Sequence, residues 1–318
     1  MFNKIKRKLK KSEWIMSSYS SILEAMYKLP FIPNEIPLKI YYMITFGQKL
    51  DLNNPKSFNE KLQWLKLYHI NNNKLYTTGA DKYQVRKYVK DKGLSSILNE
   101  LYVVKDNIDE IDFGKLPNSF VVKGTRNGHI ICKDKPKMNL DKHIKKFKQE
   151  IKKDFGVSTG ELHYKDIDNR IIVEKYIGTS DGDLPLDYKI YCFNGEPSYI
   201  CVYERDPIDF STVRYFYDFE WKPQHDYISS DFASEADRYK KPTNLKEMYD
   251  VAKKLSVPFP FVRVDLYNIN EQLIFGELTF TPTGGFGKAY TEKALNDFGN
   301  KIILPTQANN ITIDWCLL

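Results

Sequence analysis

The stretch FVRVDLYNINEQLIFGELTFT, residues 261–281, decides the fold. Two runs rich in β-branched and aromatic residues, 261–267 and 273–280, flank a polar turn, and this pattern predicts two neighbouring antiparallel strands. Because side chains alternate between the two faces of a strand, Arg263 and Asp265 share one face. The hairpin is therefore expected to present charged side chains on one surface of a sheet.

Two acidic side chains of this hairpin have the chemistry of a metal site. Glu277, on the second strand, lies opposite Asp265 if the hairpin register allows. Facing carboxylates repel each other unless a cation lies between them, and Mg²⁺ prefers one or two carboxylates together with phosphate oxygens. The pair predicts a magnesium site. From the residues alone, a salt bridge of Arg263 with either carboxylate, without a metal, explains the pattern as well.

The rest of the chain predicts a mixed α+β protein with mostly antiparallel strand pairs. Asn194-Gly195 is a strong signal for a tight hairpin turn, and Ser57 with Glu60 forms the signature of a helix capping box. The other expected strands are residues 120–123, 170–176, 187–193 and 199–203. Further helices are expected from Asp81 to Gly93, from Asn139 to Gly156 and from Asn244 onward, with a joint at residues 77–80.

Three glycine-containing segments could serve a ligand. FVVKGTRNGH at 120–129 combines a lysine with small residues that let backbone N–H groups approach phosphate oxygens. RIIVEKYIG at 170–178 could present backbone groups to an adenine edge, and TPTGGFG at 281–287 could admit a substrate close to the backbone. Each segment alone is explained equally well by an ordinary hairpin, a buried strand or a loop.

Size and composition indicate a globular enzyme. With 318 residues, 42% of them hydrophobic, the chain suits two or three subdomains packed around a cleft. No apolar run approaches the roughly 18 residues of a membrane span, and no signal peptide is evident, so a cytoplasmic protein is expected. The four cysteines are scattered without a CxxC pair, which favours reduced thiols.

The positive charge is concentrated at the N-terminus. The formal charge is 48 − 41 = +7, and six of the cations lie in the first eleven residues: Lys4, Lys6, Arg7, Lys8, Lys10 and Lys11. Interleaved with apolar residues, this segment predicts either a basic helix on anionic lipid at the inner face of the membrane or a solvated tail. Nucleic acid is not expected as a partner, because no recognition motif follows.

The order of these motifs resembles the ATP-grasp enzymes, and most closely the TupA-like ATP-grasp family of bacterial surface-polysaccharide loci. The strings that carry the resemblance are FNEK at 58–61, DKYQVR at 81–86, DYK at 187–189, FNGEP at 193–197, RVDLY at 263–267 and FGELTFTP at 275–282. It covers roughly residues 40–305. The resemblance implies an ATP-grasp fold, in which two α+β subdomains grip ATP behind a helical N-terminal region.

The resemblance also implies a division of the chain into three regions. Residues 1–80 would form a basic, helical N-terminal region. Residues 81–178 would contain the small lid subdomain, at about 116–178, and residues 179–318 would form the C-terminal subdomain with the metal site.

Individual residues take implied roles from the family. ATP phosphates would be bound by Lys82, with Arg86 as its rival, and by Lys123 under a lid of Gly124, Thr125, Arg126, Asn127, Gly128 and His129. Adenine would meet Glu174, Lys175 and Ile177, and the ribose would meet Asp181, Asp183 or Asp187. Mg²⁺ would be held by Asp265, Glu277 and Thr279, the last a poorer ligand than the Asn or acidic residue that many family members place there. Arg263 and Lys189 would steady the transferred phosphoryl group, and Gly284, Gly285 and Lys288 would contact the substrate.

The implied activity is an ATP- and Mg²⁺-dependent ligation of a carboxylate to an amine through an acyl phosphate. The implied substrate is an anionic sugar, such as a uronic acid of a capsular, teichuronic or lipopolysaccharide chain, joined to an amino acid or another amine. Two alternatives come from other classes. A glycosyltransferase would use Asp181-Gly182-Asp183 as a metal motif, and an idle ATP-binding scaffold would need no paired carboxylates.

Overall fold

The computed structural model describes residues 19–178, 185–205, 212–229, 233 and 238–306. Three features discussed above lie outside this part of the chain: the basic segment 1–11, the acidic residues Asp181 and Asp183, and Cys316. In the described ranges, no helix combines the length and apolar character needed to cross a bilayer. Cys132, Cys192 and Cys201 are buried free thiols.

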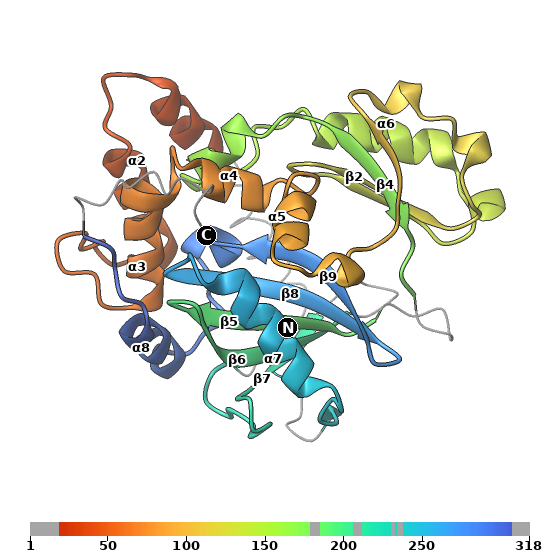
Figure 1. Ribbon diagram of the computed structural model, residues 1–318. Coiled ribbons are helices and arrows are strands. Elements are labelled where there is room, and N and C mark those ends of the chain that lie inside the picture. Colours follow the sequence, from red (N-terminus) through yellow and green to blue (C-terminus); the bar gives the residue numbers. More distant parts are fainter. Residues whose placement is uncertain (1–18, 179–184, 206–211, 230–232, 234–237, 307–318) are drawn as a thin grey trace, which may run out of the picture.

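Two antiparallel sheets form the framework of the molecule (Figure 1). The smaller sheet has the strand order β1 (Leu101–Lys105), β4 (Ile171–Lys175), β2 (Phe120–Gly124) and β3 (His129–Cys132). The larger sheet has the order β7 (Thr212–Tyr217), β6 (Glu196–Arg205), β5 (Asp187–Phe193), β8 (Phe261–Ile269) and β9 (Gln272–Thr279). Every strand pair is antiparallel, so the α+β prediction is confirmed.

Helices cover the sheets and build the N-terminal region. Residues 19–28 are helical and precede α2 (Glu35–Phe46), α3 (Phe58–Leu65), α4 (Lys74–Ala80) and α5 (Val85–Asp91). The later helices are α6 (Leu140–Glu150), α7 (Leu245–Ser256) and α8 (Glu292–Lys301). In Figure 1, α6 lies against the smaller sheet and α7 against the larger one, while α3 and α8 pack together at one end. The predicted helical N-terminal region is present.

Local sequence signals explain where several elements begin and turn. Ser57 and Glu60 form the predicted capping box, in which each side chain satisfies a backbone N–H group of the other. Asp81 accepts hydrogen bonds from the backbone of Tyr83 and Gln84 just before α5. The tight turn at Asn194 and Gly195, with φ angles of 51° and 81°, joins β5 to β6 as expected for this dipeptide.

Two local predictions are wrong. Residues 77–80, expected to be a joint, form the last turn of α4, because Asn73 caps that helix and Tyr76 packs in the core. The helix from Asn139 ends at Glu150 and not at Gly156. Gly156 lies beyond the helix's last turn, with φ of 79°, where a Cβ would press against Glu161 and Tyr164.

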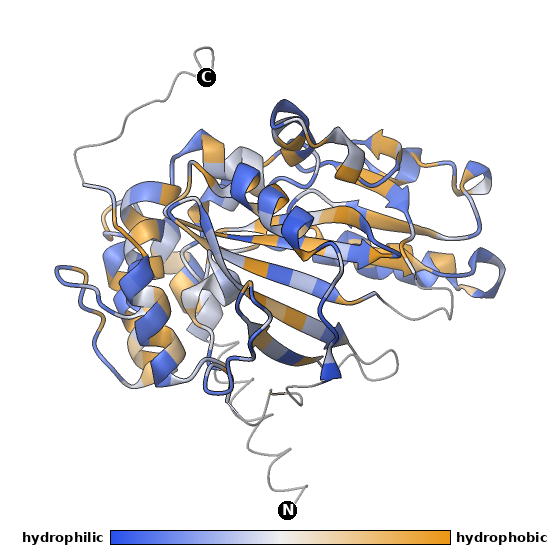
Figure 2. Ribbon diagram, turned by 60° about the horizontal axis from the view of Figure 1, so that its bottom comes forward, coloured by the Kyte–Doolittle hydropathy of each residue, from blue (hydrophilic) through white to orange (hydrophobic). Residues whose placement is uncertain are grey.

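Each sheet has its own hydrophobic core. The smaller sheet packs Phe120, Val122 and Val173 with Phe147 of α6. The larger core joins the apolar faces of the larger sheet to α7, α8 and the N-terminal helices. Orange and blue bands alternate along the strands in Figure 2, because one face of each strand is buried while the other carries polar groups.

Candidate active site

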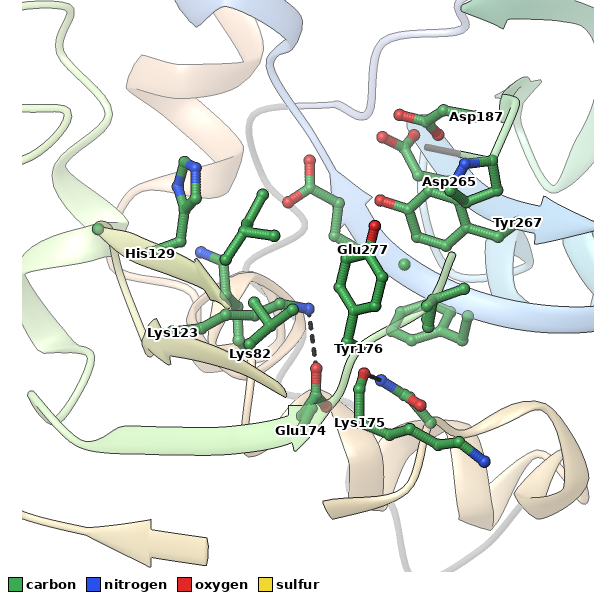
Figure 3. A pocket seen from close by; sticks show the side chains of 18 of the residues that line it. Lys82, Lys123, His129, Glu174, Lys175, Tyr176, Asp187, Asp265, Tyr267 and Glu277 are labelled. Carbon is green, nitrogen blue, oxygen red and sulfur yellow. Dashed lines mark hydrogen bonds and ion pairs between the residues drawn. The ribbon is translucent and has the colours of Figure 1, made fainter. Parts of the chain in front are cut away.

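A cavity of about 440 Å³ opens between the two sheets, and both contribute its lining (Figure 3). The strands bring most of the predicted site residues to it from distant parts of the sequence. The predicted residues that line the cavity are Lys82, Lys123, Arg126, Asn127, Gly128, His129, Glu174, Lys175, Ile177, Asp187, Lys189, Asp265 and Glu277. Lys123 and His129 approach from the smaller sheet, whereas Asp265 and Glu277 approach from the larger one.

The larger sheet supplies a buried network of charges. Asp265 pairs with Glu277 across β8 and β9, in the predicted register. Both oxygens of Asp265 are engaged by cations, with Arg263 Nε 2.6 Å from Oδ1 and Lys189 Nζ 2.5 Å from Oδ2. Lys189 also lies 2.6 Å from Asp187. The salt bridge considered as an alternative to the metal site is therefore present in the structure, at the same carboxylate.

This network fixes the protonation of its members. Burial alone would raise the pKa of Asp265, but Arg263 and Lys189 outweigh it and hold that pKa below its usual range. Burial opposes the charge of Lys189, and the neighbouring Asp265 overcomes it, so the pKa of Lys189 is raised. Burial raises the pKa of Asp187. Asp265 is thus an ionised carboxylate that is held by ammonium and guanidinium groups.

The loop between β2 and β3 carries cations to the opposite side of the cavity. Gly124 and Gly128 close the turn through an N–H···O bond of 3.1 Å, and Gly128 has φ of 78°. The Asn127 side chain donates to the carbonyl of Glu150 at 2.7 Å, which ties the loop to the end of α6. Lys82 donates to the carbonyl of Arg126 at 3.0 Å. Burial lowers the pKa of Lys82.

Glu174 links two of these cations. Its carboxylate lies 2.8 Å from Arg86 Nη1 and 2.8 Å from Lys123 Nζ, and only 6% of the residue is exposed. Arg86 and Lys82, which the sequence left as rivals, both line the cavity. Both oxygens of the Glu174 carboxylate therefore bind cations. An adenine base at the end of this strand would have to contact backbone groups or neighbouring side chains instead.

Several predicted residues lie behind the cavity and do not belong to its described lining, which omits Gly124, Thr125, Arg263, Thr279, Gly284, Gly285 and Lys288. Thr125 is buried and donates to the carbonyl of Asp168 at 2.6 Å, so it braces the loop from within. Thr279 accepts from Arg263 and donates to Glu277, both at 3.0 Å. Arg263 and Thr279 thus hold the carboxylates from behind.

The glycine turn after β9 packs against the N-terminal helices. Gly284 and Gly285 are buried, and their carbonyls accept hydrogen bonds from Lys66 at 2.7 Å and from Gln63 at 2.8 Å. The same Lys66 ammonium donates to the carbonyl of Thr159. Lys288 is exposed beyond the turn. The structure therefore does not bring these three predicted substrate residues, Gly284, Gly285 and Lys288, to the cavity.

Further lining residues, most of them aromatic or apolar, were given no role in the sequence analysis, although Tyr176, Tyr267, Phe275 and Gly276 lie within its motifs. The further lining residues are Asn99, Val121, Ile131, Phe155, Tyr176, Pro185, Tyr203, Thr212, Tyr267, Phe275 and Gly276. Val121 and Ile131 could have been found, because they pair across β2 and β3 and alternate in step with Lys123. Tyr203 could not, since β6 carries no motif at this position. Its ring centroid lies 5.0 Å from the Lys189 ammonium.

The donor set fits a hard divalent cation that arrives with phosphate oxygens. Asp265 and Glu277 supply facing carboxylates, and Asp187 Oδ1 is a buried oxygen without a hydrogen-bond partner in the described structure. Among the described residues, no cluster of three or more His, Cys, Asp or Glu could enclose a metal by itself. A site of this kind depends on ligand oxygens to complete the coordination shell, as Mg²⁺ sites commonly do.

Comparisons with known proteins give a family and several similar structures. D-alanine–D-alanine ligase from Bacillus anthracis, complexed with ATP, is 16% identical with a TM-score of 0.44, over 77% of this chain and 69% of that one. The Helicobacter pylori ligase is 16% identical with a TM-score of 0.45 over the same shares. N5-carboxyaminoimidazole ribonucleotide synthetase from Thermus thermophilus is 8% identical with a TM-score of 0.40, over 65% and 46%. No curated protein matches the sequence.

The family assignment rests on the match to a family model and not on these distant structures. The model described as TupA-like ATPgrasp matches residues 60–303, which is more than half of the chain and includes both sheets and the cavity. The protein therefore belongs to the TupA-like ATP-grasp family and has the ATP-grasp fold.

Proposed function

We propose that the protein is an ATP- and Mg²⁺-dependent ligase that joins a carboxylate to an amine. The observation that carries the proposal is the cavity itself, where the Asp265 and Glu277 carboxylates face the cations Lys82 and Lys123 across the gap between the sheets. Such an arrangement accommodates a polyphosphate chain and its metal ion, whereas a single ion pair would not require opposed groups on two sheets.

The reaction proceeds in two steps. A carboxylate oxygen of the substrate attacks the γ-phosphorus of ATP, and the bond between this phosphorus and the bridging oxygen breaks. ADP leaves, and the substrate becomes an acyl phosphate. The amine nitrogen then attacks the acyl carbon, inorganic phosphate leaves, and the nitrogen loses a proton as the amide forms. Positioning and charge neutralisation supply most of the acceleration in phosphoryl transfer.

The cavity residues divide into groups with separate tasks. Lys82 and Lys123 bind phosphates under the loop of residues 124–129. Backbone groups of Glu174, Lys175 and Ile177 meet the adenine, and Asp187 is placed to reach the ribose. Asp265 and Glu277 would hold Mg²⁺, and Lys189 would balance the charge of the transferred phosphoryl group. Arg263 and Thr279, which lie behind the cavity, would position these two carboxylates. The bound metal would neutralise phosphate charge, and the loop would keep water from the acyl phosphate.

The substrate proposal is an anionic sugar, a uronic acid of a bacterial surface polysaccharide, joined to an amino acid or another amine. It is supported by the family to which the chain belongs. Substrate contact by Gly284, Gly285 and Lys288 stays a prediction, as does the division at residues 80 and 178. We place the protein in the cytoplasm, at the inner face of the membrane.

Ligand-dependent thermal unfolding tests the proposal. ATP with Mg²⁺ should raise the Tm of the wild type, since a ligand at about 100 times its Kd stabilises a fold by about 2.7 kcal/mol. Asp265→Asn and Lys123→Ala should weaken this shift, whereas Lys254→Ala, an exposed lysine on α7, should not. Stabilisation by UDP-sugars and not by ATP would favour the glycosyltransferase instead. If ATP with Mg²⁺ raised the Tm of Asp265→Asn as much as that of the wild type, the assignment of Asp265 to the metal site would be wrong.

A further inference from the structure

Exposed apolar side chains are concentrated in one part of the described structure. Ten large hydrophobic residues are exposed there, and seven of them fall between residues 19 and 43. These seven, which we call the N-terminal apolar face, are Tyr19, Ile22, Leu29, Phe31, Ile36, Ile40 and Met43. Scattered apolar residues are normal on protein surfaces, whereas exposed apolar residues that are concentrated in one region indicate a site of interaction.

Five of these residues lie on two helices, and the other two, Leu29 and Phe31, lie in the connection between them. In α2, Ile36, Ile40 and Met43 recur at four and three residues, which is one stripe of a helix. The opposite side of α2 is already used, because Leu38 and Tyr42 are buried in the core. The outer stripe is therefore the side of α2 that stays exposed in the described structure.

The two helices are neighbours, so their outer sides contribute to one surface. Tyr27 of the first helix and Leu38 of α2 both lie over Gly160, where a Cβ would meet both side chains. Phe31, in the connection between the helices, is 76% exposed, the highest value of any large hydrophobic residue described. An aromatic ring at the tip of a turn is well placed to insert into an apolar medium.

The charge that precedes this face in the sequence indicates which partner it binds. The six cations of residues 1–11 end eight positions before Tyr19, and without them the chain carries 48 − 6 = 42 cations against 41 acidic residues, or +1. Almost the whole charge excess thus precedes the apolar face in the sequence. An anionic bilayer offers negative headgroups and an apolar interior together, whereas an anionic polymer offers only the charge.

We propose that the N-terminal apolar face docks on an anionic lipid bilayer, with residues 1–11 binding the headgroups. A single weak signal gives marginal membrane binding and two give stable binding, which is the combination found at this end of the chain. One ion pair connects the helix of residues 19–28 to the segment that leads into the cavity lining. Lys28 pairs with Asp154 at 2.6 Å, and the next residue, Phe155, lines the cavity. This part rests on the proposed function: docking would present the cavity to a membrane-held sugar.

Vesicle sedimentation of the full-length protein tests the docking. The wild type should bind vesicles containing phosphatidylglycerol at least about tenfold more tightly than vesicles of phosphatidylcholine alone. Phe31→Glu with Ile40→Glu should lower binding at least about tenfold. The matched control is Val257→Glu with Ile303→Glu, which charges two exposed apolar positions elsewhere and should bind like the wild type. Lys4→Glu with Lys8→Glu should also weaken binding.

Three outcomes would overturn the proposal. The first is that the wild type does not bind anionic vesicles, and the second is that the Phe31→Glu/Ile40→Glu variant binds them equally well. The third is that the wild type is a dimer in solution and this variant is a monomer. The last result would show that a second copy of the chain covers the face. The shift of Tm by ATP with Mg²⁺, measured in parallel without lipid, confirms that each variant is folded. It also tests the ligase proposal separately, because lipid binding does not enter that measurement.

Discussion

The Lys189 ammonium lies 2.5 Å from Oδ2 of Asp265. Arg263, two positions away on the same strand, donates to both oxygens of this carboxylate, from Nε to Oδ1 at 2.6 Å and from Nη2 to Oδ2 at 2.7 Å. In the absence of nucleotide, the carboxylate is therefore already neutralised by the protein's own cations. A metal ion held by Asp265 would compete with Lys189 and Arg263 for these oxygens, and a released Lys189 would be available to a phosphate.

Replacing this lysine should strengthen the binding of a divalent cation in the absence of ATP. In Lys189→Met, Oδ2 of Asp265 keeps only the hydrogen bond from Arg263 Nη2, at 2.7 Å, so Mg²⁺ or Mn²⁺ alone should raise the Tm more than it does in the wild type. Without metal, the variant should be less stable by about 3 kcal/mol, because a buried charge network loses one partner. Metal titrations followed by thermal unfolding measure both effects. Lys254→Met is the control, and equal metal shifts in all three proteins would contradict the competition.

Removing the Glu174 carboxylate should have opposite effects on the empty and the nucleotide-bound protein. Glu174→Gln leaves Arg86 and Lys123 without their bridging charge, which should lower the free energy of unfolding by about 2 kcal/mol, because the carboxylate is buried while its two partners are partly exposed. The same two uncompensated cations should attract phosphate, so the ATP-dependent rise in Tm should be larger than in the wild type. Glu100→Gln, an exposed neighbour, serves as the control. A smaller ATP shift would mean that Glu174 contacts the nucleotide directly.

His163 should make the fold sensitive to acid. It is buried, neither ring nitrogen has a hydrogen-bond partner among the described residues, and burial lowers its pKa to about 3. Because the unfolded chain takes up this proton near pH 6.5 and the folded chain does not, stability is lost as the pH falls from 6.5 toward 3. The loss should reach about 2 kcal/mol at about pH 5.

Urea unfolding at about pH 7 and about pH 5 measures this contribution. His163→Phe, which keeps a ring without a titrating group, should lose about 2 kcal/mol less than the wild type between these two values. The exposed His143→Gln change should leave the pH dependence of the wild type intact. An identical pH dependence in His163→Phe would show that other groups cause the acid sensitivity.

A methyl group at Gly124 should disturb the phosphate loop. A Cβ at this position would overlap the carbonyl oxygen of Asn127, so the turn would have to open. Gly124→Ala should lower the free energy of unfolding by about 1–3 kcal/mol, the usual cost of overpacking, and should weaken the ATP-dependent rise in Tm. Gly114→Ala, in a surface turn, is the control. An unchanged ATP response would show that the loop does not cover the phosphates.

Local patterns predicted most of the fold because local forces specify those elements. The capping box at Ser57 and the turn at Asn194 depend on atoms a few residues apart, and both are confirmed. The end of the helix from Asn139 was missed for the opposite reason. Its apolar positions continue to Phe155, yet tertiary packing and not periodicity decides where the helix stops.

Site residues that lie in a motif on a single strand could be predicted from the sequence. Site residues that meet only because distant segments come together in the fold could not. Asp265 and Glu277 follow from strand alternation together with a short hairpin. The ion pair of Glu174 with Arg86 joins residues 88 positions apart, and no sequence pattern indicates it. Tyr203 enters the cavity only because β6 lies beside β5 in the larger sheet.

Lys66 joins two segments that are far apart in the sequence, and this contact restricts how the two sheets can move relative to each other. Its ammonium holds the carbonyls of Thr159 and Gly284, while Asn71 binds Gly160 at 3.0 Å and Thr281 binds Glu161. Residues 159–161 are therefore fixed to the larger sheet's side of the molecule, although the chain runs from the smaller sheet into this segment and back again. A swing of the smaller sheet would have to pivot on the stretches flanking this anchor. Residues 159–161 would thus stay in place while the smaller sheet rotates. Substitutions at Lys66 or Asn71 would change how fast the two sheets separate, although neither residue lines the cavity.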